Sequence, residues 1–132
     1  RAVRVRALGG APMSYLVTII PEDIGRRIEG KDLPETPLLL LLEEAGIPVA
    51  AATQSISATV ADAEVSRALS VPAGSPLIEV NRLVRDAANR PVEMIRVLYR
   101  PELYRFEISM RRVTAEAGRT WESEAPDRLR SL

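Results

Sequence analysis

A carboxylate and a phenol lie six residues apart, at Glu93 and Tyr99, in an extended run that follows a turn. Extended chains alternate their side chains between two faces, so both groups share one face of a predicted strand with Ile95 and Val97. Two polar groups that bracket aliphatic side chains fit a pocket wall, where they would orient a ligand against an apolar lining. The same pattern also fits a solvated glutamate at a strand start and a tyrosine that caps the core.

Two arginines, Arg4 and Arg6, lie two residues apart in the first alternating run. Their side chains therefore leave one face of a strand, with Cα atoms about 6.6 Å apart. Two such guanidinium groups make a clamp for a phosphate or a carboxylate. Exposed arginines that meet acidic residues across a sheet have the same spacing.

Tyr15 and Gln54 are further candidates for this site. Tyr15 lies on the predicted hairpin partner of the arginine strand, on a face that also fits plain core. Gln54 lies on a strand otherwise rich in small and apolar residues. It fits either a buried amide that needs partners or an ordinary polar residue with its hydrogen bonds satisfied.

The 132 residues include neither histidine nor cysteine. Ser-His-Asp and Cys-His catalytic systems, disulfides, imidazole metal sites and zinc-thiolate sites are therefore excluded. No glycine-rich phosphate loop, paired-carboxylate motif or aromatic-interleaved basic patch is present, and we expect neither a metal nor a cofactor. The 18 cationic and 18 acidic side chains balance, so no global field attracts nucleic acid or an anionic membrane.

The length predicts one domain with an ordinary hydrophobic core. The longest purely apolar run, Leu38 to Leu42, is far shorter than the roughly 20 residues of a membrane helix, and the start has no hydrophobic signal region. We therefore expect a cytoplasmic protein. The chain starts at Arg1 inside an alternating pattern, so we expect it to be part of a longer protein.

The elements that position the candidate residues follow from alternation, turn residues and helix caps. Their order predicts an α+β fold with a mostly antiparallel sheet and helices packed on one face. In the last strand, Phe106, Ile108 and Met110 are predicted to face the core, and the polar tail after it is predicted to be a solvated helix or disordered. The predicted elements are a hairpin of strands 2–8 and 12–20 around Gly9-Gly10, a helix at 22–28, a helix from an N-cap at Thr36 to Gly46, a strand at 47–60, a helix at 61–69, a meander of strands 77–85, 91–100 and 104–112, and a tail at 114–132.

From about Val3 to Val113 the chain resembles a UTRA domain, the effector-binding module of the HutC branch of GntR-family bacterial transcription regulators. The order and spacing of several loose motifs together carry this resemblance. It divides the chain into a ligand-binding domain at 1–113 and a C-terminal tail at 114–132. The motifs are the Arg-x-Arg strand, LLEEAGI at 41–47, LSVPAGSPLIEVNRLVRD at 69–86, and Pro-Val-Glu followed by Tyr-Arg-Pro-x-x-Tyr-x-Phe at 91–106.

The resemblance implies a chorismate-lyase-like fold, a homodimer, and an upstream winged helix-turn-helix domain through which operator DNA is bound and then released when a small metabolite binds. In sugar-phosphate-binding members, strand arginines hold the phosphate, which implies this role for Arg4 and Arg6. The glutamate after Pro-Val and the tyrosine six residues later contact the sugar in those members. Glu93 and Tyr99 match these two positions.

The chain departs from such members where they carry polar groups. Tyr15 and Gln54 stand at positions where glutamates are common, and Leu39 stands in place of a tyrosine. A pocket that loses these carboxylates and hydroxyls suits amino sugars less well, and we expect a small anionic metabolite with a flatter or more apolar body. The predicted ligand-binding residues are Arg4, Arg6, Tyr15, Gln54, Glu93 and Tyr99.

Two other functions fit the same residues. A chorismate-lyase-like enzyme would use the arginines to grip carboxylates and Glu93 as an acid or base, because such chemistry needs neither histidine nor cysteine. A dimerisation module would need no ligand at all. Of the three, a non-enzymatic ligand sensor agrees best with the UTRA-like segment that ends at Phe106.

Overall fold

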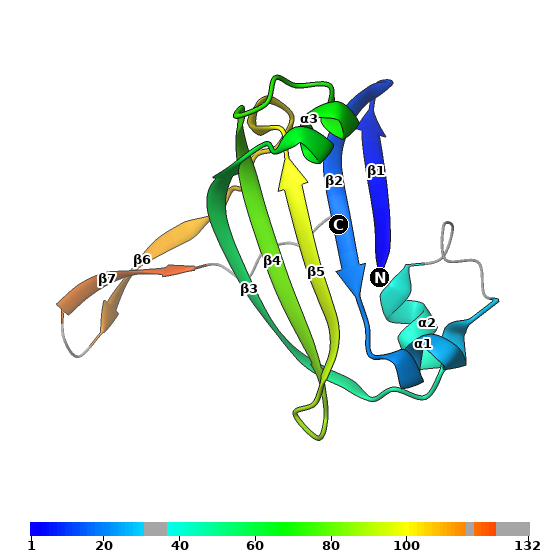
Figure 1. Cartoon of the computed structure of the whole chain (residues 1–132). Helices are drawn as coiled ribbons and strands as arrows, with labels where there is room; N and C mark the ends of the chain where they lie inside the picture. Colours follow the sequence, from blue (N-terminus) through cyan, green and yellow to red (C-terminus); the bar gives the residue numbers. More distant parts are fainter. Residues whose placement is uncertain (31–36, 116–117, 124–132) are drawn as a thin grey trace.

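The computed structural model describes residues 1–30, 37–115 and 118–123. Over these ranges the chain forms an α+β domain and a separate two-stranded hairpin (Figure 1). The elements are β1 (Ala2–Leu8), β2 (Ala11–Ile19), α1 (Glu22–Ile28), α2 (Leu38–Glu44), β3 (Val49–Val60), α3 (Ala63–Leu69), β4 (Pro76–Asp86), β5 (Pro91–Tyr99), the 3-10 helix η1 (Pro101–Leu103), β6 (Met110–Ala115) and β7 (Gly118–Ser123).

Five strands form one antiparallel sheet in the order β1-β2-β5-β4-β3. The β1–β2 hairpin turns at Gly9 and Gly10, whose positive φ angles of 57° and 82° suit residues without a Cβ. The β4–β5 turn is held by Asp86, whose carboxylate accepts the backbone N–H groups of Ala88 and Arg90. The α+β class and the antiparallel meander of β4 and β5 are confirmed.

The helix α3 packs across β2 on one face of this sheet, which we call the α3 face. Asp62 caps its N-terminus by accepting the backbone N–H of Val65 at 2.8 Å. Beneath α3, the aliphatic side chains of Val65 and Leu69 pack against Val17 and Leu98 of the sheet, among others. The predicted helix at 61–69 is thus present, and its first residue is Ala63.

The helices α1 and α2 lie at the end of the sheet where β2 stops and β3 begins (Figure 1). Ile24 of α1 and Leu42 of α2 are fully buried against Val84 and Val92 of the sheet. α1 has the predicted bounds. The predicted N-cap of the second helix, Thr36, lies outside the described residues.

The predicted strand at 104–112 is not part of the sheet. After β5, η1 turns the chain, residues 104–109 form no strand, and β6 begins only at Met110. Phe106, Ile108 and Met110, predicted to face the core, are exposed by 46%, 52% and 56%. The alternation of this segment was a sound sign of strand propensity, but a strand also needs a neighbour, and the sheet provides none here.

Part of the predicted polar tail is ordered as a strand. β7 pairs with β6 in an antiparallel hairpin that projects from the sheet (Figure 1), so the expectation of a solvated helix or disorder over 114–132 is wrong for residues 114–115 and 118–123. Trp121 lies opposite Arg112, whose guanidinium carbon is 5.4 Å from the ring centroid. This contact explains the place of the tryptophan.

Candidate ligand-binding site

The two predicted arginines lie on the sheet face opposite α3, which we call the arginine face. Residues paired directly across antiparallel strands share a face, and Arg6 pairs with Ser14, which pairs with Tyr99. Arg4 lies one row further along, opposite Leu16. By this register and the alternation along each strand, the polar side chains of the arginine face are Arg4, Arg6, Ser14, Thr18, Gln54, Arg82, Glu93 and Tyr99.

Glu93 is a buried carboxylic acid on this face, with 5% of its surface exposed. Burial raises its pKa, because the charged form loses hydration, and the nearby positive charge of Arg82 acts in the opposite direction. Within the described part of the chain, the carboxylate takes part in no hydrogen bond or ion pair. It is therefore free to receive a donor from a bound molecule.

Tyr99 lies at the other end of the same strand and is 2% exposed. Its ring stacks on that of Tyr104, with centroids 4.0 Å apart and planes 18° from parallel. Burial, followed by the effect of Tyr104, raises the pKa of Tyr99 to about 12, while Arg6 and Arg82 both act to lower it. Tyr99 thus keeps its proton and lies within the field of two arginines from different strands.

Gln54 reaches this face from the edge strand β3 and holds Arg82. Its side-chain oxygen accepts hydrogen bonds from Arg82 Nε at 3.0 Å and from Arg82 Nη2 at 2.7 Å. Gln54 is exposed, so it is the satisfied polar residue and not the buried amide of the two alternatives. Sequence reasoning missed Arg82, although the β4 alternation Ile78, Val80, Arg82, Val84 places it in an otherwise apolar row.

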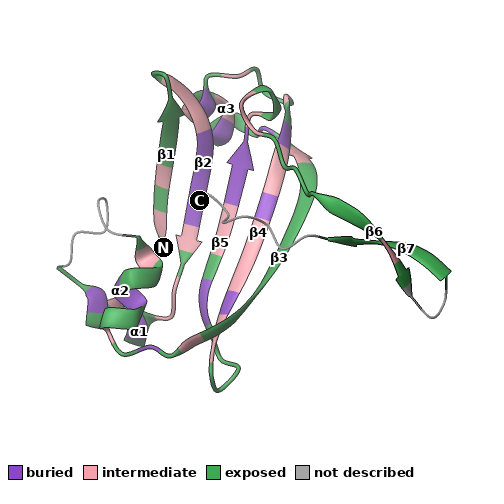
Figure 2. Ribbon diagram, turned by 180° about the vertical axis from the view of Figure 1, so that it is seen from behind, coloured by how far each residue is buried: buried purple, intermediate pink, exposed green. Residues whose placement is uncertain are grey.

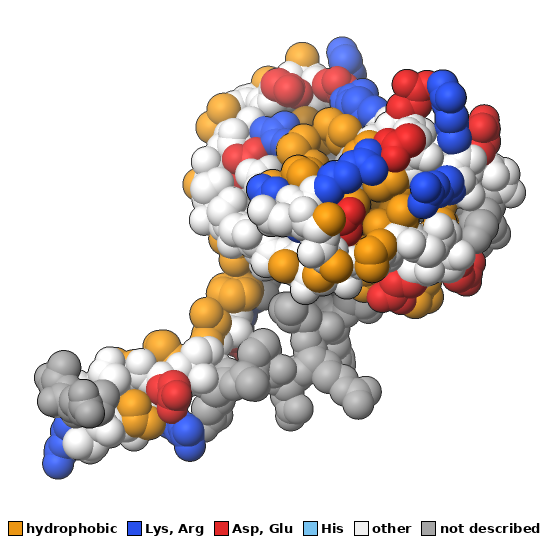
Figure 3. Space-filling model, turned by 90° about the horizontal axis from the view of Figure 1, so that it is seen from below, with side chains coloured by type: hydrophobic (Ala, Val, Ile, Leu, Met, Phe, Trp, Pro, Cys, Tyr) orange, Lys and Arg blue, Asp and Glu red, His pale blue; other side chains and the backbone are white. Residues whose placement is uncertain are grey.

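Arg4 extends the site into a cleft of about 490 Å³ between the sheet and the helices α1 and α2. Apolar parts of its lining come from Ile20, Ile28 and Leu38. Its charged side chains are those of Arg1, Arg4, Arg26, Glu22 and Glu29. Figure 3 views this end of the molecule and shows apolar side chains with arginines and acidic side chains among them. Arg26 is paired with Glu22, so this lining offers charges of both signs beside an apolar surface, and Arg4 is the cation that continues into it from the arginine face.

Tyr15 is not brought together with the other predicted residues. It pairs with Val5 and Leu98, which places it on the α3 face, and it is 5% exposed. Its hydroxyl donates to the Glu64 carboxylate of α3 at 2.5 Å. This hydrogen bond, followed by burial, raises the pKa of Tyr15. The structure gives Tyr15 a role in attaching α3, while the other five predicted residues share the arginine face.

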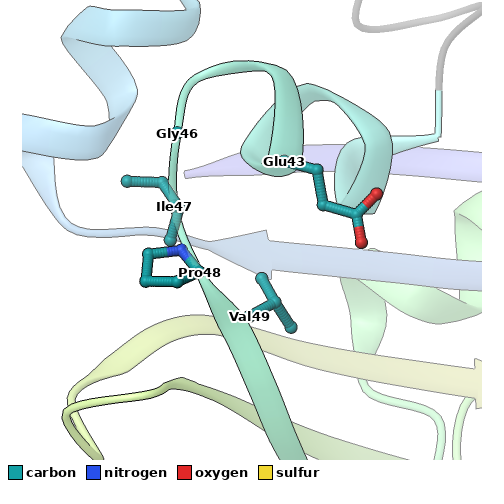
Figure 4. Close-up of a pocket in the computed structure, with 5 residues that line it drawn as sticks. All are labelled: Glu43, Gly46, Ile47, Pro48 and Val49. Carbon is teal, nitrogen blue, oxygen red and sulfur yellow. The ribbon is translucent and has the colours of Figure 1, made fainter.

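A second hollow of about 410 Å³ lies where α2 leads into β3 (Figure 4). Its lining consists of Gly46, Ile47, Pro48 and Val49, and the one charged side chain is Glu43. Figure 4 shows the Glu43 carboxylate pointing away from Pro48. This hollow offers no convergent set of donors, so we place the candidate site on the arginine face.

The described residues include no group of three acidic side chains that could hold a metal ion. Among them, no helix is both long enough and apolar enough to cross a membrane. What the arginine face can do chemically is bind: arginines supply positive charge, and Glu93 and Ser14 supply buried polar groups for a ligand to meet.

Comparison with known proteins identifies the family of this chain. The family model of the UTRA domain matches residues 1–105. A curated relative, the HTH-type transcriptional regulator Rv0792c of Mycobacterium tuberculosis, is 29% identical over 119 residues. The match spans 87% of this chain but only 44% of the relative's length.

Solved structures are similar as well. A transcriptional regulator from Streptomyces coelicolor is 34% identical, with a TM-score of 0.72 over 80% of this chain and 69% of that one. The ligand-binding domain of a GntR-family transcriptional regulator from Bordetella bronchiseptica is 26% identical, with a TM-score of 0.67 over 83% and 72% of the two chains. None of these relatives supports the lyase alternative.

Proposed function

Because this chain belongs to the UTRA domain family, we propose that it is the effector-binding and dimerisation domain of a cytoplasmic bacterial regulator of the GntR family, HutC subfamily. In this proposal, a small anionic metabolite binds the arginine face and controls how an upstream winged helix-turn-helix domain binds operator DNA. The observation that carries the proposal is the register that gathers Arg4, Arg6, Arg82, Glu93 and Tyr99 on one face.

The charges of the arginine face support an anionic effector. Arg4, Arg6 and Arg82 form no ion pair with the acidic residues that the structure describes, whereas Arg90, Arg96 and Arg100 on other surfaces each have a carboxylate partner. Glu93, the acid on this face, has a raised pKa and so carries less negative charge than an exposed glutamate at the same pH. The face therefore has an excess of positive charge to offer a ligand.

The apolar part of the site supports a ligand with a nonpolar body. Ile95 and Val97 lie between Glu93 and Tyr99, and the cleft beside Arg4 is lined by Ile28 and Leu38. A ligand whose acidic end meets the arginines would bury its remaining surface against these side chains. We assign no catalytic role to Glu93, because the described residues place no second acid–base group in contact with it.

Ligand binding to this face would act on DNA binding by favouring one arrangement of the full-length protein over another. A ligand shifts such an equilibrium only by its difference in affinity for the two states. The site joins β1 and β2 at one edge of the sheet to β4 at its interior, and α1 and α2 border the cleft. These are the elements whose relative positions a bound ligand would fix.

The segment 104–110 supports the homodimer. It has the alternation of a strand, yet Phe106, Ile108 and Met110 are exposed. At one edge of the sheet, β3 pairs only with β4 and has no charged residue or proline in twelve positions, although natural edges usually carry such protection (Figure 2). We propose that segment 104–110 of a second copy adds to the free edge of β3.

The effector proposal is tested by thermal denaturation of this chain with phosphosugars, organic acids, aromatic carboxylates and fatty acids. A ligand at about 100 times its dissociation constant adds about 2.7 kcal/mol of stability. Changing Arg4→Ala together with Arg6→Ala should abolish the shift caused by the most stabilising anion. The matched control, Arg67→Ala with Arg85→Ala, removes the same charge elsewhere and should keep the shift. Unchanged affinity in the Arg4/Arg6 variant would refute the site.

The dimer is tested separately by sedimentation. The wild-type chain should sediment as a dimer, and Ile108→Asp should convert it to a monomer. Leu8→Asp, a change at an apolar residue of similar exposure on the β1–β2 hairpin, should leave the dimer intact. A monomeric wild type, or a dimer that survives Ile108→Asp, would contradict this mode of assembly.

A further inference from the structure

Arg82 occupies the interior of the sheet, on β4, and forms no ion pair with a described acidic residue, although its charge acts to lower the pKa of the nearby Glu93. Its side chain is half-buried between the neighbouring strands. Charges withdrawn from water are normally paired, because an unpaired charge loses hydration without compensation. An arginine in this position is therefore a place where an anion would be stabilised.

Gln54 orients this arginine without neutralising it. Two N–H groups of Arg82, on Nε and Nη2, donate to the single Gln54 side-chain oxygen at 3.0 and 2.7 Å. The guanidinium group is rigid and planar, so two hydrogen bonds fix its orientation. No hydrogen bond from Nη1 to a described residue is present, so the N–H groups of Nη1 stay available to donate to an acceptor.

Arg82 and the β1 arginines approach Tyr99 from different sides. In the sheet order, three strand spacings separate β1 from β4, about 14 Å. Tyr99 is on β5, between them, and both Arg6 and Arg82 act on its pKa. The arginine face thus has two centres of positive charge, one at Arg4 and Arg6 and one at Arg82, with Ile95, Val97 and Tyr99 between them.

We propose that Arg82, oriented by Gln54, is a second anion-binding residue, and that the effector is a small molecule with two acidic groups joined by a largely apolar body. One acidic group binds Arg4 and Arg6, and the other binds Arg82. This inference rests on the proposed effector site and adds the requirement for a second acidic group, which is a carboxylate or a phosphate.

The test compares diacids with matched monoacids by their affinity for this chain. Succinate, glutarate, adipate and suberate are paired with butyrate, valerate, hexanoate and octanoate, and 3-phosphoglycerate is paired with glycerol 3-phosphate. One diacid should bind at least about tenfold more tightly than its monoacid, since a charge-assisted hydrogen bond contributes about that much. The two sets of pairs show whether the acid that accompanies the carboxylate is a second carboxylate or a phosphate.

Three variants test which arginine binds which acidic group of the ligand. Arg82→Gln should remove the preference for the diacid, lowering the diacid affinity by about tenfold, and should lower the monoacid affinity by much less. Gln54→Ala retains the charge of Arg82 but removes the two hydrogen bonds that orient its guanidinium group. It should therefore cause a smaller loss of affinity for the diacid. Arg85→Gln removes one charge at the end of the same strand, where Arg85 donates to the Asn89 carbonyl, and should leave both affinities unchanged.

The outcomes separate this inference from the proposed site. If Arg82→Gln keeps the preference for the diacid, if diacids and monoacids bind equally, or if no pair binds, the second anion-binding role is wrong. If Arg4→Ala with Arg6→Ala leaves the monoacid affinity unchanged, the proposed effector site at Arg4 and Arg6 is wrong. Loss of the diacid preference in Arg82→Gln, with monoacid binding retained, is the result that our inference requires.

Discussion

The two faces of the five-stranded sheet hold their polar side chains in different ways. On the α3 face, Tyr15 donates to Glu64, and Arg96 is paired with Glu79. On the arginine face, Glu93 and Ser14 are both buried, at 5% and 1% exposure, and neither has a hydrogen-bond partner among the described residues. Buried polar groups in folded proteins are nearly always hydrogen-bonded, and each exception calls for an explanation. In our proposal, ligand binding accounts for the exceptions here.

This difference in hydrogen bonding suggests a different role for each face. The α3 face contains a hydrophobic core, and its Tyr15 and Arg96 side chains have partners within the fold. In our proposal, the buried polar groups of the arginine face lower the stability of the free protein and become favourable when a ligand supplies their partners, as is common at binding sites. Changes on the two faces should therefore have opposite consequences for stability and affinity.

The largest effect on stability should come from Leu69→Ala on the α3 face. Leu69 is fully buried beneath α3, so removing most of its side chain leaves a cavity and lowers the free energy of unfolding by about 2–5 kcal/mol. Chemical denaturation measures this loss. The affinity of the folded protein for its anion should stay the same, and a loss of affinity as large as that of the Arg4/Arg6 variant would break the division between the faces.

The next effect should come from Tyr15→Phe. Removal of the hydroxyl breaks the hydrogen bond to Glu64 and should lower the free energy of unfolding by about 1–2 kcal/mol, because a hydrogen bond to a charged group contributes more than one between neutral groups. Urea denaturation gives the value, and ligand titration should show unchanged affinity. A Tyr15→Phe protein that is fully stable but binds no anion would return Tyr15 to the site, as the sequence suggested.

Glu93→Gln should have the opposite sign. The folded-state pKa of Glu93 is raised above the ordinary value of about 4.3. Its contribution to stability is therefore fully present below that pH and is lost as pH rises through the raised pKa. At pH 7 the free energy of unfolding of the variant should exceed that of the wild type by about 1 kcal/mol, and its affinity for the anion should change.

Denaturation across pH 4 to 8 checks this sign. The wild type should lose stability relative to Glu93→Gln as pH rises above the ordinary carboxyl pKa, about 4.3. If the difference between the two proteins does not change with pH, the Glu93 carboxylate has no raised pKa in the folded state. Glu102→Gln on η1 serves as a control, because the pKa of that exposed acid is lowered.

The smallest effect should come from Ser14→Ala, the change next to Tyr15 in sequence but on the other face. The Ser14 hydroxyl is buried without a partner, so its removal should be neutral or slightly stabilising, within about 0.5 kcal/mol. Parallel urea curves for Ser14→Ala and Tyr15→Phe make the comparison. A Ser14→Ala protein destabilised as much as Tyr15→Phe would mean that both faces satisfy their polar groups.

Local sequence patterns predicted the elements that depend on neighbouring residues. Gly9-Gly10 gave the hairpin, the run at 22–28 gave α1, and the alternation from Glu93 to Tyr99 gave the shared face of β5. Each of these features depends on turn chemistry or on the period of a single element. The UTRA resemblance then gave the family and the fold, and both are confirmed.

Pairing between distant segments was harder to predict. Tyr15 was assigned to the site because β1 and β2 are partners, but the register pairs Arg6 with Ser14 and Val5 with Tyr15. A shift of one residue reverses every side chain of a strand. Likewise, Arg82 could be recognised as a site residue only from the pairing of β3 with β4, which places Gln54 opposite it. The strand propensity of 104–109 could not show that this segment has no neighbouring strand in the sheet.

The central claim is that the effector binds the arginine face and not the α3 face. Methyl NMR of the chain, titrated with the anion that raises its melting temperature most, tests this claim most directly. Ile95 and Val97 lie on the arginine face, whereas Val65 and Leu69 lie beneath α3. We predict that the signals of Ile95 and Val97 shift while those of Val65 and Leu69 stay unchanged. Shifts of Val65 and Leu69 with unchanged Ile95 and Val97 would contradict the claim.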